Sequence, residues 1–178
     1  RVGEETADRD ITVIEGVMGY YDGLGGDSAE ASSYHIASIT GTPAVLVVNG
    51  RGAGLSLAAL VKGFLEFRKD SSIAGVIVNC TSPMMAERLR GPIEETGAAF
   101  LGCLPKLPDI RLESRHLGLV MPGEVKELEE SLTRLAEEME RHLDLDRLLE
   151  LAAGCRDLSA CCVHTGENCV PAGGKWPA

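Results

Sequence analysis

The stretch Ile73-Ala74-Gly75-Val76-Ile77-Val78-Asn79 is a continuous apolar run that ends in a polar residue. Because its residues do not alternate between apolar and polar, it is typical of a strand buried on both faces of a sheet. Similar runs lie at 44–48 and 99–104, and helical patterns at 55–67 and 83–96 separate the three. The sequence therefore predicts an α/β fold with a mostly parallel sheet covered by helices.

The N-terminal part predicts a further strand. Residues 11–14 are apolar and β-branched, and Glu15 follows them. We expect a buried strand here, with a carboxylate at its C-terminal end, where open α/β sheets bind ligands. After a glycine-rich loop, the pattern predicts a helix from Ser28 to Ile39 that Gly41-Thr42-Pro43 ends.

The C-terminal third has a different residue pattern from the rest of the chain. From 123 to about 153 the chain is charged and amphipathic, which predicts a long helix or a helix pair that packs on the core or faces a partner. Its apolar stripe is Leu128, Leu132, Leu135 and Met139. The helical spacing of apolar residues ends near Gly154. We therefore expect residues 1–153 to form one domain region and 154–178 to be a Cys- and Gly-rich tail or linker without fixed structure.

The composition of the chain argues against several classes of function. The chain has 178 residues, 44% of them hydrophobic, which suits one ordinary domain. Its formal net charge of −10 argues against binding nucleic acid. There is no apolar run long enough for a membrane span, and the N-terminal residues lack a signal-peptide pattern, so we expect a cytoplasmic protein with no membrane partner. Four of six cysteines crowd the tail without the usual zinc spacing.

The densest local signal is the segment Glu15-Gly16-Val17-Met18-Gly19-Tyr20-Tyr21-Asp22-Gly23. Three glycines would allow a ligand to approach the backbone, and a strand-end carboxylate suits Mg²⁺ bound together with phosphates. An ordinary glycine-rich turn explains the same residues. The residues alone leave both interpretations open.

This segment resembles the signature of the cobyrinic acid a,c-diamide synthases, and the resemblance continues in order along residues 11–151. The matching motifs are Glu15-Gly16-Val17-Met18-Gly19, the helix at 28–39, Gly41-Thr42-Pro43-Ala44-Val45-Leu46-Val47-Val48, Gly75-Val76-Ile77-Val78-Asn79, Leu101-Gly102-Cys103-Leu104-Pro105 and Glu113-Ser114-Arg115-His116-Leu117-Gly118-Leu119. The resemblance implies an incomplete P-loop fold of the dethiobiotin-synthetase-like type. It also implies part of an ATP- and Mg²⁺-dependent ligase that amidates the a and c carboxylates of cobyrinate in cobalamin biosynthesis, with ammonia that a glutaminase domain releases from glutamine.

The resemblance assigns roles within the first motif. It implies that Glu15 is a Mg²⁺ ligand, that Asp22 is a catalytic residue near the corrin carboxylate or the incoming ammonia, and that Tyr21 contacts the substrate. Glu15 could instead cap a loop, and Asp22 could be a turn residue, because Asp-Gly is common in turns.

It also assigns roles to residues after the strands. Asn79 matches an asparagine that reads the adenine edge, which its amide donor and acceptor suit, and Pro105 would flank the base. Arg51 could bind a substrate carboxylate or could be a solvated arginine on a tight turn. His116 could take part in catalysis or in structural hydrogen bonding.

Two motifs that the resemblance implies for the complete enzyme do not occur in this sequence. The sequence has no Gly-x-x-x-x-Gly-Lys-Ser/Thr loop for phosphates and no cysteine nucleophile elbow. We therefore expect the isolated chain to be inactive, with activity belonging to a parent protein. Alternatives are an amidase of a related tetrapyrrole, a dethiobiotin-synthetase-like ligase and a non-catalytic scaffold. An open sheet edge would favour a homo-oligomer.

Overall fold

The computed structural model describes residues 10–108, 110 and 122–155 of the chain. The chain divides into two compact units, Arg1–Glu15 with Arg156–Ala178, and Gly16–Cys155. All the helices and strands described lie in the second unit. The predicted tail lies outside the described residues from Arg156 onward.

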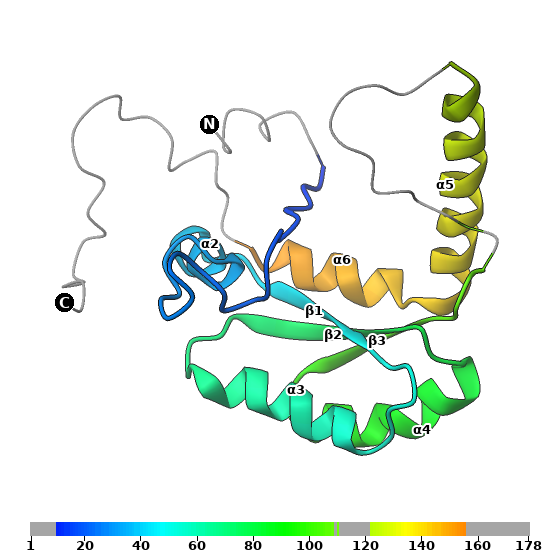
Figure 1. Ribbon diagram of the computed structural model, residues 1–178. Helices are drawn as coiled ribbons and strands as arrows, with labels where there is room; N and C mark the ends of the chain where they lie inside the picture. The colour runs from blue at the N-terminus through cyan, green and yellow to red at the C-terminus, as the bar shows by residue number, and fades with distance from the viewer. Residues whose placement is uncertain (1–9, 109, 111–121, 156–178) are drawn as a thin grey trace. The chain divides into compact units, whose positions relative to one another are not determined.

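The second unit is built around a parallel sheet (Figure 1). Its elements are α2 (Ser33–Thr40), β1 (Ala44–Asn49), α3 (Ser56–Phe67), β2 (Ile73–Asn79), α4 (Pro83–Glu94), β3 (Ala99–Leu104), α5 (Pro122–His142) and α6 (Leu145–Ala153). The strands stand in the order β1-β2-β3, and both neighbouring pairs are parallel. The predicted α/β fold and its three central strands are confirmed.

Helices cover both faces of the sheet. In Figure 1, α3 and α4 lie together on one side and α6 lies on the other. The α3–α4 side holds the larger core, to which β2 contributes Val76 and Val78; Ile77 of β2 instead packs with Leu101 and Leu143 on the α6 side. Because successive strand residues point to opposite faces, a strand covered on both sides must be apolar throughout. This explains the uninterrupted run in β2.

Local capping fixes where α4 and α6 begin. The Ser82 side chain accepts a hydrogen bond from the Met85 N–H, and Pro83 opens α4. The Asp144 carboxylate likewise accepts from the Arg147 N–H, at 2.9 Å, and thereby starts a second C-terminal helix. The predicted long helix is therefore a helix pair, α5 followed by α6.

Two predictions near the N-terminus are wrong. The helix expected from Ser28 begins only at Ser33, because Ala31 has φ of 61° and Ser32 caps the helix. Residues 11–14 form no strand, and Val13 is 83% exposed. A strand needs a hydrogen-bonded neighbour, and in the described part of the chain the ladder partners belong to β1, β2 and β3.

The junction between α5 and α6 packs against the outer edge of β3. Leu143 forms an antiparallel bridge with Gly102, and the Asp144 N–H donates to the Leu101 carbonyl at 2.9 Å. Gly102 has φ of 111°, and a Cβ there would clash with the His142 carbonyl oxygen. Only glycine allows this close approach.

No helix within the described ranges is long and apolar enough to cross a membrane.

Candidate functional site

Three of the predicted site residues lie at one edge of the sheet. Asn79 is the last residue of β2, Arg51 follows the end of β1, and Pro105 follows the end of β3. In the sheet register Asn79 is opposite Asn49 of β1 and opposite Leu104 of β3. The parallel topology thus places Arg51, Asn79 and Pro105 after three neighbouring strand ends, where open α/β sheets bind ligands.

Asn79 is half-buried and holds the two neighbouring loops in place. Its side-chain Oδ1 accepts a hydrogen bond from the Cys80 N–H at 2.9 Å, and its carbonyl accepts from the Gly50 N–H at 2.7 Å. The side-chain Nδ2 makes no hydrogen bond to any described residue. The amide therefore presents a donor, with an acceptor lone pair beside it, as recognition of a purine edge requires.

Arg51 lies on the tight turn after β1. Its N–H donates to the Asn49 Oδ1 at 3.0 Å, and Gly50 fits against β2 because a Cβ there would clash with Val78 and Thr81. The side chain is exposed, and its guanidinium has no ion pair with a residue that the structure describes. It is a cation available to an anion at this edge of the sheet.

The loop after β3 adds two residues to this edge. Pro105 is half-buried, and Lys106 beside it is exposed. The buried Thr81 ties this loop to β2, since its N–H donates to the Leu104 carbonyl at 3.3 Å. Sequence reasoning did not single out Thr81 or Lys106. A lysine directly after a predicted strand end was the available signal for Lys106.

Tyr21 lies at the opposite end of the strands, near the point where β2 begins. Its hydroxyl donates to the Phe64 carbonyl at 2.6 Å, and its ring packs against Phe64 and Phe67 near the end of α3. Arg51 precedes the start of α3, which has 12 residues and so a length of about 18 Å. The structure therefore does not bring Tyr21 together with the strand-end residues.

Two further tyrosines complete this aromatic cluster. The Tyr20 hydroxyl donates to the Ser71 carbonyl, and the Tyr34 hydroxyl donates to the Asp70 carboxylate at 3.0 Å. Burial, followed by the neighbouring Tyr21, raises the pKa of Tyr20, and burial is also the main cause that raises the pKa of Tyr21 and Tyr34. The phenols are thus neutral hydrogen-bond donors at pH 7.

The two predicted carboxylates have few contacts. Asp22 is exposed and sits in a turn, where its N–H donates to the Gly19 carbonyl at 2.9 Å. Glu15 is also exposed and belongs to the other compact unit. His116 lies outside the described residues. The roles predicted for these three residues stay predictions.

Over residues 10–108, 110 and 122–155, no group of three His, Cys, Asp or Glu side chains could hold a metal ion. Mg²⁺ that bridges phosphates needs only one or two protein carboxylates, because waters and phosphate oxygens complete its shell. A single carboxylate such as Glu15 fits that mode of binding.

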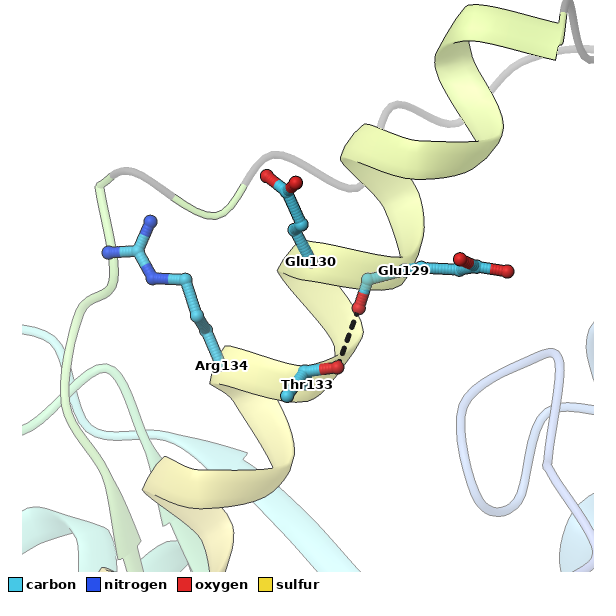
Figure 2. Close-up of a pocket in the computed structure, with 4 residues that line it drawn as sticks. All are labelled: Glu129, Glu130, Thr133 and Arg134. Carbon is cyan, nitrogen blue, oxygen red and sulfur yellow. Dashed lines mark hydrogen bonds between the residues drawn. The ribbon is translucent and has the colours of Figure 1, made fainter.

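The described cavities lie elsewhere. One hollow of about 440 Å³ follows the polar side of α5 and is lined by Glu129, Glu130, Thr133 and Arg134, where Thr133 donates to the Glu129 carbonyl (Figure 2). Another, of about 420 Å³, adjoins the start of β3 and includes Arg90 and Arg147 in its lining. Neither contains a predicted site residue.

Comparison with known proteins gives concordant matches. A family model described as an AAA domain matches residues 1–114. The cobyrinate a,c-diamide synthase of Listeria innocua is 45% identical over 152 residues, which are 84% of this chain and 34% of that protein. The enzyme of the same name from Streptococcus sanguinis is 44% identical over 147 residues, 82% of this chain and 32% of that protein.

A third relative of that name, from Thermoplasma volcanium, is 43% identical over 150 residues, 83% of this chain and 32% of that protein. The chain thus spans about a third of the length of the curated relatives that it matches. No solved structure matches it. The resemblance inferred from the ordered motifs is confirmed.

Proposed function

This chain belongs to the AAA domain family and matches one section of the cobyrinate a,c-diamide synthases, and from this premise we propose that it supplies the nucleotide- and carboxylate-binding surface of an ATP-dependent carbon–nitrogen ligase. The ligase would convert the a and c side-chain carboxylates of cobyrinate into amides. The carboxylate oxygen would take the γ-phosphoryl group of bound ATP, giving an acyl phosphate and ADP, and ammonia would then displace phosphate from the acyl carbon to form the amide.

The observation that carries this proposal is the row of strand-end residues. Asn79 offers an amide donor and an acceptor lone pair, which suit the edge of adenine. Arg51, one strand away, offers an exposed guanidinium that can bind a carboxylate with two parallel hydrogen bonds. Pro105 would lie against the flat face of the base. One edge of the sheet would thus bind both the nucleotide and the acid.

The first motif would supply the remaining groups. Glu15 would hold Mg²⁺ beside the phosphates, and Asp22 would accept a proton from the attacking ammonia. Tyr21 would contact the corrin only if its segment leaves the end of α3, where its hydroxyl donates to the Phe64 carbonyl. We also propose that ammonia comes from glutamine through a glutaminase domain and that the enzyme works in the cytoplasm.

Calorimetric titration of the chain with Mg²⁺ and ATP tests the nucleotide site. We expect binding by the wild type, weaker binding by Asn79→Ala and Glu15→Ala, and no change in Lys62→Ala, whose exposed side chain pairs with Glu66 on α3. No binding by the wild type would favour a non-catalytic scaffold.

Assays with alternative substrates test the specificity. With cobyrinate, ATP and ammonium, we expect the isolated chain to make no amide, and a longer relative with the same strand-end residues to do so. Faster amidation of another tetrapyrrole or of a small carboxylic acid by that relative would overturn the choice of cobyrinate.

A further inference from the structure

Thr81, just after β2, carries a hydroxyl that has no hydrogen bond to any residue that the structure describes. The residue is only 7% exposed. Every described side-chain oxygen that is fully shut off from solvent has a partner, so the Thr81 hydroxyl keeps some access to solvent. A hydroxyl that is mostly buried and unpaired costs stability, and it therefore marks a position where a ligand can supply the missing bond.

The side chain of Thr81 points to the turn between β1 and α3. Its backbone N–H donates to the Leu104 carbonyl of β3, whereas its Cβ lies 2.9 Å from the position that a Cβ on Gly50 would occupy. The Ala53 N–H donates to the Gly50 carbonyl at 3.1 Å, so the turn folds back at this point. The Thr81 hydroxyl therefore lies at the base of the turn that leads into α3.

The start of α3 offers backbone donors at the same turn. Leu55, at the N-cap, makes no side-chain capping hydrogen bond, and the first amide of α3 with a backbone acceptor is that of Leu57, which donates to the Gly54 carbonyl at 2.9 Å. The N–H groups of Gly54, Leu55 and Ser56 donate to no residue in the described ranges. Because the N–H groups of a helix point toward its N-terminus, these donors face the surface at which β1 ends.

We propose that this turn and Thr81 form a binding site for one oxyanion, either a carboxylate or a phosphate group. The amides of Leu55 and Ser56 and the Thr81 hydroxyl would donate to the anion. The exposed guanidinium of Arg51 would add a positive charge. Residues 49–56 contain no acidic side chain, although the chain has a net charge of −10. The inference rests on the proposed function, because it names the groups beside Arg51 that would hold a carboxylate of cobyrinate.

Calorimetric titration of the 178-residue chain with cobyrinate, and separately with ATP and Mg²⁺, tests the hydroxyl. Thr81→Val keeps the shape of the side chain without the hydroxyl, and Thr81→Ser keeps the hydroxyl. We expect Thr81→Val to bind cobyrinate at least about tenfold more weakly than the wild type, and Thr81→Ser to bind it more tightly than Thr81→Val does. The control Thr133→Val, whose hydroxyl donates to the Glu129 carbonyl on α5, should bind as the wild type does.

Thermal unfolding separates binding from folding. The Tm of Thr81→Val should not be lower than that of the wild type, because the hydroxyl has no bond within the described fold to lose. A weaker affinity at an unchanged Tm is a result that a merely structural role of Thr81 would not give.

A second pair of variants tests the amides of the turn. Leu55 has φ of −54°, which suits proline, and its side chain is 70% exposed. Leu55→Pro removes one of the free N–H groups, whereas Leu55→Ala keeps it. We expect Leu55→Pro to bind cobyrinate at least about fivefold more weakly than Leu55→Ala.

The two ligands distinguish the possible outcomes. Lower affinity of Thr81→Val for ATP, with an unchanged affinity for cobyrinate, would support the oxyanion site and assign it to a phosphate group. Unchanged affinity for both ligands in Thr81→Val, or no binding of either ligand by the wild type, overturns the inference. If Asn79→Ala loses ATP binding while Thr81→Val binds both ligands normally, this inference alone fails and the proposed nucleotide site stands.

Discussion

The parallel sheet has one edge formed by the N-terminal ends of its strands and one formed by their C-terminal ends, and the polar side chains at the two are used differently. At the N-terminal edge, Tyr20, Tyr21 and Tyr34 all donate hydrogen bonds within the protein, and the Tyr21 ring packs against two phenylalanines. At the C-terminal edge, Arg51 is exposed and has no ion pair in the described residues, and the Asn79 amide nitrogen is similarly unbonded there. One edge is organised to hold the chain in place, and the other leaves its polar side chains available to a ligand.

The largest effect should come from removing an anchor at the N-terminal edge. Tyr21→Ala loses the ring contacts with Phe64 and Phe67 and the hydrogen bond to the Phe64 carbonyl. Because Tyr21 is half-buried, we expect the free energy of unfolding to fall by about 2 kcal/mol, and by about 1 kcal/mol in Tyr21→Phe. Urea denaturation measures both. Unchanged stability together with lost corrin binding would instead support the substrate contact that the sequence predicts.

A pair of variants at Asn79 separates ligand binding from loop structure at the other edge. Asn79→Ala removes both the acceptor for the Cys80 N–H and the proposed nucleotide contact, whereas Asn79→Asp keeps the acceptor and removes the amide donor. Both should weaken ATP binding by about tenfold, and only Asn79→Ala should lose about 1 kcal/mol of stability. Calorimetry and thermal unfolding measure the two effects. Full ATP affinity in Asn79→Asp would exclude adenine recognition by this amide.

Substitutions of Arg51 test whether the C-terminal ends of the strands bind a carboxylate of cobyrinate. Arg51→Ala should weaken equilibrium binding of cobyrinate by about fivefold and change stability by less than about 0.5 kcal/mol, because the side chain is exposed. Arg51→Lys keeps the charge but loses the two parallel hydrogen bonds, so an intermediate affinity is expected. Equal affinities in all three proteins would leave Arg51 a solvated turn residue.

The smallest effect concerns alkaline pH. The folded state raises the pKa of Tyr20, Tyr21 and Tyr34 above 10.0, so the unfolded chain releases these protons first. Their contribution to stability is complete below about pH 10 and is lost as the pH rises through the raised values. Unfolding free energies from about pH 8 to pH 11 should fall less steeply in Tyr34→Phe than in the wild type. An identical slope would show that Tyr34 does not take part.

The sequence predicted the core of the fold because the determining signals are local. An apolar run without alternation identifies β2, and helical spacing identifies α4. The strand-end positions of Arg51, Asn79 and Pro105 followed directly from the three apolar runs that form β1, β2 and β3.

The rest depends on contacts that no local pattern encodes. The Tyr21 hydroxyl donates to a carbonyl 43 residues away, so its packing at the end of α3 could not be read from the Gly-Tyr-Tyr-Asp motif. Residues 11–14 have the composition of a strand, but composition does not supply a neighbouring strand with which to pair. The start of α2 depended on the left-handed φ of Ala31, for which a short stretch of small residues gives no signal.

The Leu143–Gly102 bridge sets a limit on how the sheet can grow. The bridge and the hydrogen bond from the Asp144 N–H to the Leu101 carbonyl use backbone groups on the outer side of β3, so another strand could pair at these residues only if the α5–α6 junction moved away. A sheet with two free sides could extend without limit into a fibril, as stacked strands do in amyloid. Gly102 therefore also protects this side of the sheet from pairing with other strands, because a side chain at this position would clash with the His142 carbonyl oxygen and displace the junction.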